Sequence, residues 1–394
     1  MKIFWTTILI GILGTATFVF IMDPGYRWHD APVPFFRDLK EDEIRIFPTN
    51  FDERSIKVSH INFIEKPDVL LLGSSRMAPV SSIFFKKDLK IFNAGLSSAS
   101  FEDYIAIWQD MKQLGKNPKK VIIFMDPWLF NSTANNKATG WHFIGKYVEN
   151  FYSDHGYKGQ EDSKGGFKGS GTKLSLKERT LKISRSAMKT PERLSRGFDL
   201  AFQIVSWPMV KQAVKIFIKN GISRDRMINL IINRTDFGPE DRGVAKDGAT
   251  LYPLSERRAK TPSELRALVM DTFLNPNAFD EWHFDQEAKV KFDLLLNDIS
   301  QSGTEVLMIA PPLHPLMTEL LSHKINYVGL LNEVNETIRS QASKTPAVVF
   351  CDAENFEKVG CQESEMKDAT HLLEGCISKV LRYCTQNTSW SKLL

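Results

Sequence analysis

Five short apolar segments, separated by segments with helical periodicity, constrain the fold of this 394-residue chain more than any other feature. A short apolar run bounded by turn residues is typical of a strand buried on both faces of a parallel sheet. Strands that alternate with helices predict helices on both faces of that sheet, and right-handed crossovers bring the carboxyl ends of its strands to one rim. We therefore expect an α/β protein, a three-layer α/β/α sandwich with a mainly parallel sheet. The expected strands are Val69–Leu72, Lys90–Phe92, Val121–Met125, Glu305–Ile309 and Ala347–Phe350, and the expected helices are Phe101–Gln113, Gln286–Ser300, Gly329–Gln341 and His371–Tyr383.

Two serines follow the first expected strand. Gly73 ends the run Val69–Leu72, and Ser74, Ser75 and Arg76 come next. In open α/β sheets, ligands bind just outside the carboxyl ends of the strands, so a hydroxyl here lies where a nucleophile is needed. The alternative is that Ser74 and Ser75 only cap a helix. Two roles are also open for Arg76, which either binds a carboxylate or sugar hydroxyl of a substrate or forms a salt bridge.

Asp368 and His371 supply the groups that a serine nucleophile requires. A serine hydroxyl is a poor nucleophile at its free pKa and needs an adjacent base, and imidazole titrates near neutrality. Asp368 precedes His371 by three residues, close enough to fix its tautomer and to stabilise the imidazolium. The alternative is a helix N-terminus with Asp368 or Thr370 as the cap. The catalytic interpretation requires Ser75 and His371 to meet at the rim.

Together these segments resemble the sequence blocks of the SGNH (GDSL-type) hydrolase family. Gly73-Ser74-Ser75 is similar to the family's Gly-Asp-Ser block, with serine in place of aspartate, and Asp368-x-x-His371 is similar to its last block. The resemblance implies a flavodoxin-like sandwich in which Ser75 is the nucleophile, His371 the base and Asp368 the residue that orients the base. It covers about residues 68–131 and 305–383.

The oxyanion donors are the less complete part of this resemblance. Gly95 matches the glycine of the family's second block, which implies that its N–H, with that of Ser75, binds the developing oxyanion. The third block of the family supplies an asparagine, but here the third strand runs into Asp126-Pro127-Trp128. Asn131 is a candidate substitute, unless Asn131-Ser132-Thr133 is only a turn. Asp126 itself is expected to accept hydrogen bonds from backbone N–H groups at the rim.

Three further segments belong near the rim or mark a helix. His314 follows the fourth expected strand and is a candidate for lining the substrate cleft. The turn-rich segment Gly238–Pro253 is expected to overhang the site, with no role assigned to it. Thr261-Pro262-Ser263-Glu264 has the capping-box pattern with proline at the first helical position, which predicts a helix start.

Residues 3–22 carry no charged side chain and are long enough to cross a bilayer. We expect residues 1–22 to be an uncleaved transmembrane anchor. The alternative is a cleaved signal peptide, but Phe18–Met22 continue the apolar run beyond the small residues at which cleavage would occur. Lys2 favours a cytoplasmic N-terminus, so the expected location is the inner membrane, as a single-pass protein with a periplasmic body. Residues 23–67 are interpreted as a linker and entry segment, and residues 68–394 as the α/β domain.

The alternation of strands and helices stops between residues 132 and 285, which predicts a large, mostly helical insertion. The insertion includes a basic stretch at residues 158–196, which is a solvated face or lies against anionic lipid headgroups. Its apolar segment Gly197–Asn220 is a core helix of the insertion, a segment that touches the bilayer, or a docking surface. The net charge of +4 is too small to indicate nucleic-acid binding.

All four cysteines lie late in the chain, at Cys351, Cys361, Cys376 and Cys384. An even, clustered number indicates two disulfides in an oxidising compartment. Zinc is the alternative, which the absence of a CxxC pair disfavours. If one helix carries Cys376 and Cys384, their Cα atoms are about 12 Å apart, beyond the limit of roughly 7 Å for a disulfide. Each of these two cysteines is therefore expected to pair with Cys351 or Cys361.

The Gly-Ser-Ser block and the altered third block resemble the membrane-anchored branch of the family, which works with acylation systems for cell-envelope polysaccharide and teichoic acid. This implies a serine esterase or O-acyltransferase that acts on an acylated or acceptor glycan through an acyl-Ser75 intermediate, without a cofactor or metal. A polytopic membrane acyltransferase is a candidate partner. The alternative is a catalytically inactive binding or assembly protein of such a complex, in which Ser75 Oγ lies beyond hydrogen-bond reach of His371.

Overall fold

The structure is a computed structural model of the 394-residue chain. One unit consists of Ala31–Ile46, Glu53–Tyr157 and Ile231–Leu394, and the rest of the chain forms a second unit. The main sheet and the candidate site described below lie in the first of these units. The residues that the structure describes are 11, 14–19, 39–47, 53–135, 145–157, 210, 214, 231–233, 238–239, 241–275, 279, 281–386 and 388–394.

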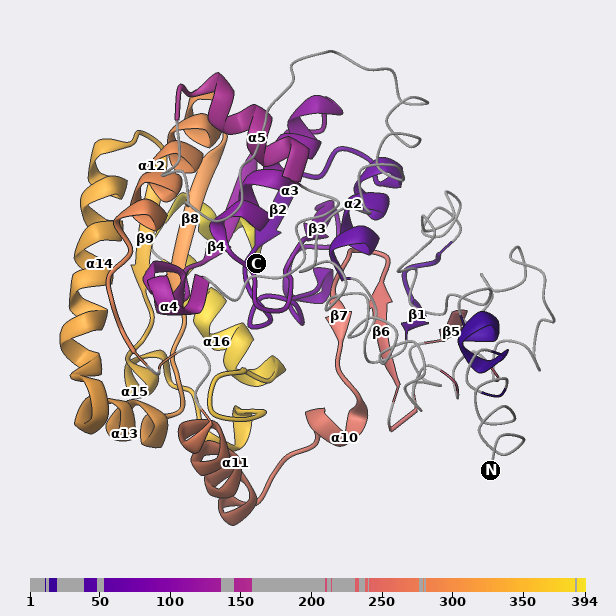
Figure 1. The fold of residues 1–394 in the computed structure, drawn as a ribbon, viewed down its shortest axis with the longest axis vertical. Coiled ribbons are helices and arrows are strands. Elements are labelled where there is room, and N and C mark those ends of the chain that lie inside the picture. Colours follow the sequence, from indigo (N-terminus) through magenta and orange to yellow (C-terminus); the bar gives the residue numbers. More distant parts are fainter. Residues whose placement is uncertain are drawn as a thin grey trace, which may run out of the picture. The chain divides into compact units, whose positions relative to one another are not determined.

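Five parallel strands form the main sheet in the order β3-β2-β4-β8-β9 (Figure 1). The order reverses at β2, because the chain passes from β2 to β3 on one side and then returns to β4 on the other. Ligands of doubly wound sheets bind at the carboxyl ends of the strands beside such a switch point. The strands are β2 Val69–Leu72, β3 Ile91–Asn93, β4 Lys120–Phe124, β8 Glu305–Ala310 and β9 Val348–Asp352, which confirms all five predicted strands to within a residue or two.

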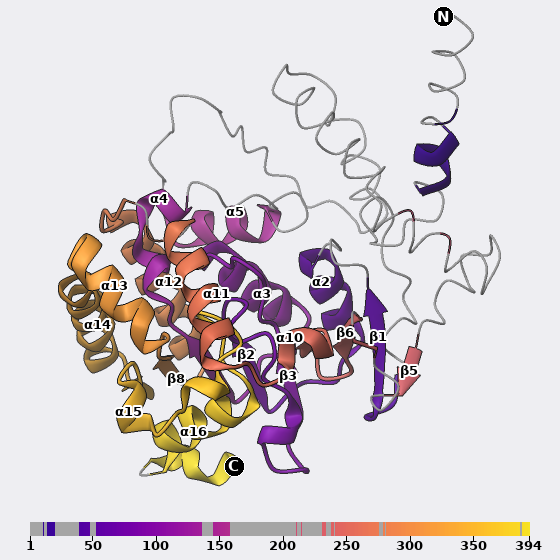
Figure 2. The ribbon, with the colours of Figure 1, turned by 90° about the horizontal axis from the view of Figure 1, so that it is seen from below.

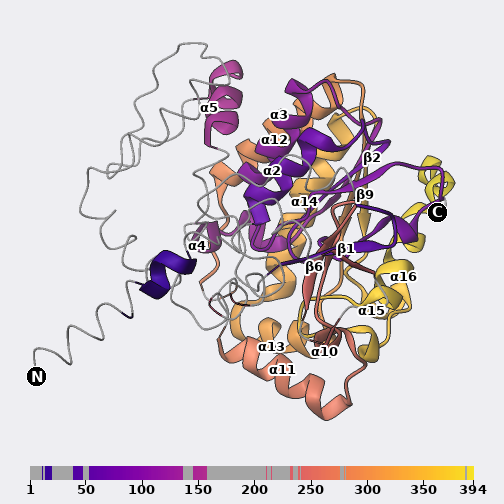
Figure 3. The same cartoon turned by 90° about the vertical axis from the view of Figure 1, so that its right-hand side faces the viewer.

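Successive side chains of each strand enter two separate cores, one on each face of the sheet. Leu70 and Leu72 pack with α3 (Phe101–Gln113) and α12 (Gln286–Gln301). Val69 and Leu71 pack with α16 (Glu374–Thr385). Figures 2 and 3 show α3 and α12 on one side of the strands and α16 on the other. All four β2 side chains are fully buried, and each contributes about 1.5–3 kcal/mol through burial.

Local capping explains where several of these helices begin. Ser100 and Asp103 form a capping box at the start of α3, and Asp285 accepts hydrogen bonds from the N–H groups of Glu287 and Ala288 at the start of α12. The capping box predicted at Thr261 is confirmed and starts α11. The remaining helices are α2 Glu53–Phe63, α4 Ser132–Asn135, α5 Gly145–Asp154, α10 Leu254–Arg257, α11 Pro262–Leu274, α13 Pro315–Ile325, α14 Tyr327–Lys344 and α15 Phe356–Val359, with 3₁₀ turns η2 Ser82–Phe84, η3 Pro127–Phe130, η5 Glu363–Glu365 and η6 Ser389–Leu393.

The helix predicted at His371–Tyr383 begins later than expected, since α16 starts at Glu374 with Leu373 as its N-cap. The Asp368 side chain accepts hydrogen bonds from the N–H groups of Thr370 and His371, both at 2.9 Å. It closes a turn there instead of capping α16, so the helix-cap alternative for Asp368 and Thr370 is wrong.

A second, four-stranded sheet corrects the interpretation of residues 23–67 as a linker. Its strand order is β5-β1-β6-β7, with bounds β1 Glu43–Phe47, β5 Ile231–Asn233, β6 Arg242–Ala245 and β7 Thr250–Leu251. Strand β1 and helix α2 thus belong to the presumed linker, and three strands belong to the insertion that was expected to be mostly helical. Within that insertion, the basic stretch at 158–196 and, apart from residues 210 and 214, the apolar segment Gly197–Asn220 lie outside the described residues.

The predicted membrane span is only partly within the described chain. Of residues 3–22, the structure describes residues 11 and 14–19. Among all described residues, no helix combines the length and the apolar character needed to cross a bilayer.

Both predicted constraints on disulfide pairing are confirmed. Helix α16 carries Cys376 and Cys384, and each pairs with one of the two earlier cysteines. The bonds are Cys351–Cys384, with Cα atoms 5.5 Å apart, and Cys361–Cys376, with Cα atoms 5.0 Å apart. The second bond encloses the turn that carries Asp368 and His371.

Candidate active site

Ser75 lies in a tight turn directly after β2. The N–H groups of Met77 and Ala78 donate to Ser74 O at 3.0 and 3.2 Å, and Ser74 Oγ accepts from the Arg76 N–H at 3.2 Å. A side chain at Gly73 would place its Cβ 2.3 Å from Met77 Cβ, so this turn requires glycine. The turn continues without an α-helix as far as η2, which means that Ser74 and Ser75 are not helix caps.

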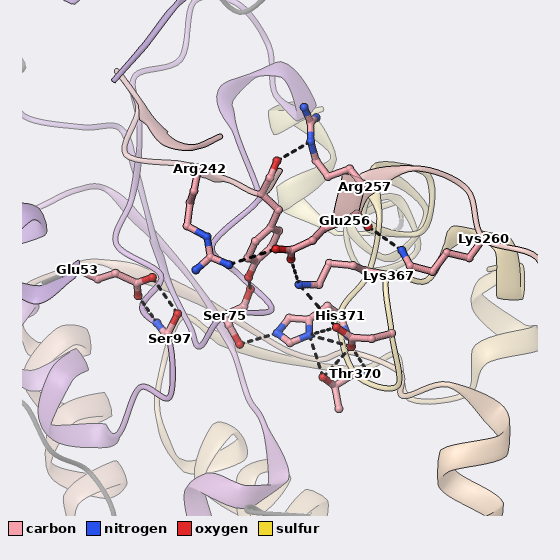
Figure 4. A network of polar contacts seen from close by, with 12 residues as sticks. Glu53, Ser75, Ser97, Arg242, Glu256, Arg257, Lys260, Lys367, Thr370 and His371 are labelled. Atoms are coloured by element: carbon pink, nitrogen blue, oxygen red, sulfur yellow. Dashed lines mark hydrogen bonds and ion pairs between the residues drawn. The ribbon is translucent and has the colours of Figure 1, made fainter. Parts of the chain in front are cut away.

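His371 reaches this turn from the other end of the chain (Figure 4). Its Nε2 lies 2.8 Å from Ser75 Oγ, and its Nδ1 lies 2.9 Å from both carboxylate oxygens of Asp368. The carboxylate favours the proton on Nδ1, which leaves Nε2 to accept the Ser75 hydroxyl proton. The convergence of Ser75, His371 and Asp368 that the sequence predicts is therefore confirmed.

Asp368 is held as a carboxylate by several donors. Burial would raise its pKa, but the hydrogen bond and charge of His371, the nearby Lys367 and the Thr370 N–H together lower the pKa well below the usual range of an aspartate. The Lys367 N–H also donates to His371 O at 2.9 Å, which closes the loop on itself. A permanently charged Asp368 is the state that stabilises an imidazolium at His371.

Tyr252 is a residue of the site that sequence reasoning missed. Its hydroxyl donates to Ser75 O at 2.8 Å, and its ring meets the His371 ring edge to face with centroids 6.0 Å apart. Burial raises the pKa of Tyr252 well above its usual value, so the hydroxyl remains a donor. The segment Gly238–Pro253 had been expected to overhang the site, but no pattern in it distinguishes this tyrosine.

A group of cations lies around one carboxylate, Glu256 (Figure 4). Lys367 Nζ lies 2.8 Å from Glu256 Oε2 and 3.7 Å from Asp368 Oδ2, and it sits over the Tyr252 ring at 3.9 Å. Arg242 Nη2 lies 3.7 Å from Glu256 Oε1. These contacts fix the position of the Asp368–His371 turn against the segment that follows β7.

Arg76, in the turn that carries Ser75, forms a buried ion pair with Asp126. Arg76 Nη1 lies 2.9 Å from Asp126 Oδ1, both side chains are almost completely buried, and Arg76 Nη2 donates to Pro312 O. The salt-bridge alternative for Arg76 is confirmed, and its role as a substrate ligand is wrong. Asp126 binds this guanidinium rather than backbone groups of the rim, and burial raises its pKa although Arg76 opposes the shift.

The predicted oxyanion donor Gly95 is already hydrogen-bonded. Its N–H donates to Asn93 Oδ1 at 2.7 Å, while Asn93 Nδ2 donates to Met77 O at 2.8 Å and Ala78 O at 3.1 Å. A Cβ at Gly95 would lie 2.8 Å from the Ala78 N. Gly95 therefore allows the turns after β2 and β3 to approach each other closely. The Asn93 side chain joins these two turns.

Asn131 has a structural role. Its Oδ1 accepts hydrogen bonds from the Thr133 N–H at 3.3 Å, from Thr133 Oγ1 at 3.1 Å and from the His283 N–H at 3.3 Å. These bonds tie the turn after η3 to the segment before α12. Asn131-Ser132-Thr133 is not only a turn, because Ser132 and Thr133 begin α4 and Asn131 forms a β-bridge with Phe284. The substitution for the third-block asparagine would use the Asn131 amide N–H groups and stays a prediction.

His314 is the N-cap of α13, and its Nδ1 accepts a hydrogen bond from the Leu316 N–H at 3.2 Å. Its own N–H donates to Ala369 O at 3.0 Å, so it touches the turn that carries Asp368 and His371. It lines a cavity that neighbours this turn, although Ser75 is not among the lining residues.

No family model matches the chain, and no curated protein matches it significantly. Within the described ranges, no cluster of three histidine, cysteine or acidic side chains is arranged to hold a metal ion.

Proposed function

We propose that the chain is a serine-dependent acyl-ester enzyme of the SGNH type, on a flavodoxin-like α/β/α sandwich. One observation carries the proposal, which is the chain of contacts from Ser75 Oγ to His371 Nε2 at 2.8 Å and from His371 Nδ1 to Asp368 at 2.9 Å. The strand order places this group at the switch point of the sheet, where doubly wound proteins bind their ligands.

The reaction follows from the proton positions. His371 Nε2 accepts the Ser75 proton as Oγ attacks the ester carbonyl, and the imidazolium then donates that proton to the departing sugar hydroxyl. The product is an acyl-Ser75 intermediate. Water or a second sugar hydroxyl then attacks the acyl carbonyl as His371 Nε2 takes its proton. The bond from the acyl carbon to Ser75 Oγ breaks, and the imidazolium of His371 donates that proton to Ser75 Oγ. Hydrolysis and transfer thus share every residue of the site.

The oxyanion site rests on fewer donors than the family resemblance implies. The Ser75 N–H makes no hydrogen bond with the described part of the chain and remains the candidate donor. The Gly95 N–H is bound to Asn93. Since each oxyanion donor is worth about 10²–10³ in rate, we expect a slower enzyme than one with a full set.

The proposed substrate is a cell-envelope glycan outside the cytoplasm. It is either an acylated glycan whose ester is attacked or an acceptor glycan whose hydroxyl receives the acyl group. The two disulfides support an oxidising compartment. The apolar run at residues 3–22 supports an anchor in the inner membrane with a periplasmic body. A polytopic membrane acyltransferase is the proposed partner where the reaction is transfer.

A fluorophosphonate probe tests the proposal directly, because it reacts only with an activated serine. We expect covalent labelling of the full chain at Ser75 and none in Ser75→Ala or His371→Ala. Ser340→Ala, which removes an exposed hydroxyl on α14, is the matched control and should label fully. Mass spectrometry of the labelled peptide identifies the site. Absence of labelling in the wild type would reject the enzyme.

The alternative is a binding or assembly protein on the same fold. The occupied Gly95 N–H favours it, since a non-catalytic protein has no need of an oxyanion donor. The contact between Ser75 and His371 speaks against it, because this alternative expects the two side chains to lie apart. An unlabelled protein that still binds its glycan would support this second function.

A further inference from the structure

A cavity of about 360 Å³ neighbours the turn that carries Asp368 and His371. One of its walls is continuous with that turn, because the His314 N–H donates to Ala369 O at 3.0 Å. Its volume falls in the range of about 300–1,000 Å³ that is usual for small-molecule sites. The cavity is lined by Pro262, Ser263, Arg266, His314, Leu316 and Glu363.

The His314 side chain brings an unused donor to this cavity. The residue is 3% exposed, and its Nδ1 accepts the Leu316 N–H, so the proton of the neutral ring is on Nε2. Burial lowers the pKa of His314, which keeps the ring neutral near pH 7. Nε2 has no hydrogen-bond partner in the described part of the chain, and the nearest carboxylate oxygen, on Glu363, is 3.9 Å away. A buried donor of this kind is destabilising unless a ligand supplies an acceptor.

The other walls carry balanced charge and two apolar surfaces. Arg266 is exposed and makes no ion pair within the described ranges, and the Glu363 side chain is also more than half exposed. One guanidinium and one carboxylate leave the cavity without a net charge, so it does not select an ion. Ser263 adds a hydroxyl that donates and accepts, while Pro262 and Leu316 supply apolar contact. Closely mixed donors, acceptors and apolar patches are complementary to a ring that bears hydroxyl groups on a C–H framework.

We propose that this cavity is a subsite for one neutral sugar unit of the substrate glycan. His314 Nε2–H and Arg266 donate to its hydroxyl oxygens, Glu363 accepts from its hydroxyl groups, and Pro262 and Leu316 contact its C–H face. Since Ser75 does not line the cavity, the unit held here is a neighbour of the sugar that carries the ester. This inference rests on the proposed function for its substrate class, but binding at the cavity is measurable without any reaction.

Saturation-transfer NMR on the full-length Ser75→Ala chain tests the subsite with four probes, the methyl glycosides of glucose, mannose, galactose and N-acetylglucosamine. We expect at least one glycoside to bind. Arg266→Gln and Glu363→Gln each remove one charged partner, and His314→Asn retains an oxygen that can cap α13 while removing Nε2–H. Each variant should raise the dissociation constant about tenfold, as expected for a lost hydrogen bond to a buried or charged group.

Arg382→Gln is the matched control, because Arg382 is exposed on α16 and does not line the cavity. It should bind as tightly as the parent chain. Binding of none of the four glycosides, or binding by all three cavity variants as tight as that of the parent Ser75→Ala chain, would overturn the subsite. The result is independent of Ser75 labelling. Labelling without sugar binding would reject the subsite alone, and sugar binding without labelling would reject the proposed enzyme activity alone.

Discussion

Asp368 combines two functions in one side chain, since it closes the turn at residues 368–371 and faces His371 Nδ1. Asp368→Asn keeps a similar shape but removes the charge that stabilises the imidazolium. We expect the second-order rate of fluorophosphonate labelling to fall by up to about 10⁴-fold, with little change in circular dichroism. A variant that labels at the wild-type rate would show that Asp368 does not orient the base.

Lys57 gives the free energy of unfolding a distinctive pH dependence. Its Nζ is buried against Asn93 O at 2.7 Å and against Gly248 O, and burial lowers its pKa to about 8 against the attraction of Glu53 and Asp247. The folded protein therefore loses this proton at lower pH than the unfolded chain. The free energy of unfolding should rise between pH 7.5 and 9.5 by roughly 2 kcal/mol from this group.

Urea denaturation at these two pH values measures the effect. Lys57→Met should be destabilised and should lack this increment, whereas Lys119→Met, which changes an exposed lysine, should retain it. An equal rise in Lys57→Met and the wild type would contradict the assignment.

Sequence patterns located the residues of the candidate site that meet at Ser75, but not their supporting contacts. Ser75 was predictable because it follows Gly73 at the end of an apolar run, and His371 because Asp368 precedes it by three residues. Arg76, Gly95 and Asn131 occupy equally suggestive positions, yet their side chains or N–H groups bind Asp126, Asn93 and Thr133. Such partners are selected by three-dimensional proximity, which no spacing along the chain encodes.

At the scale of elements, the disulfide Cys361–Cys376 brackets the turn that carries the base, whereas Cys351–Cys384 joins β9 to α16. Replacing the first pair by serine should reduce stability by about 3 kcal/mol, as estimated for a loop of this length, and should also reduce Ser75 labelling, because the base loses its restraint. Replacing the second pair is the matched control, with a stability loss of about 3–5 kcal/mol but labelling close to that of the wild type in the folded protein.

Thermal unfolding and labelling rates, both measured below the melting temperature of the weaker variant, separate the two effects. Equal labelling in the two double variants would mean that the disulfide Cys361–Cys376 does not position His371.

The strands were more predictable than the elements around them. An apolar run such as Val69–Leu72 is buried on both faces, so its sequence alone identifies it. Strands β1 and β6 are short and mixed in polarity, and α2 follows a proline-rich segment, so local patterns did not reveal them. The start of α16 was misplaced because Asp368 can cap a helix or close a turn, and tertiary contacts decide between these roles.

For the whole molecule, the expected membrane anchor gives a direct test. Full-length protein should remain in the membrane fraction after alkaline carbonate washing, because residues 3–22 are long and apolar enough to span a bilayer. A chain that lacks residues 1–22 and is exported by a cleavable signal should become soluble in the periplasm and still label at Ser75. A carbonate-soluble full-length protein would contradict the anchor.

Under the proposed function, the separation of Ser75 and His371 along the chain also has a consequence for biosynthesis. The two residues are 296 positions apart. A nascent polypeptide therefore exposes the Ser75 alcohol long before the imidazole has been translated. Any product that ends before His371 would carry a serine without the group proposed to activate it.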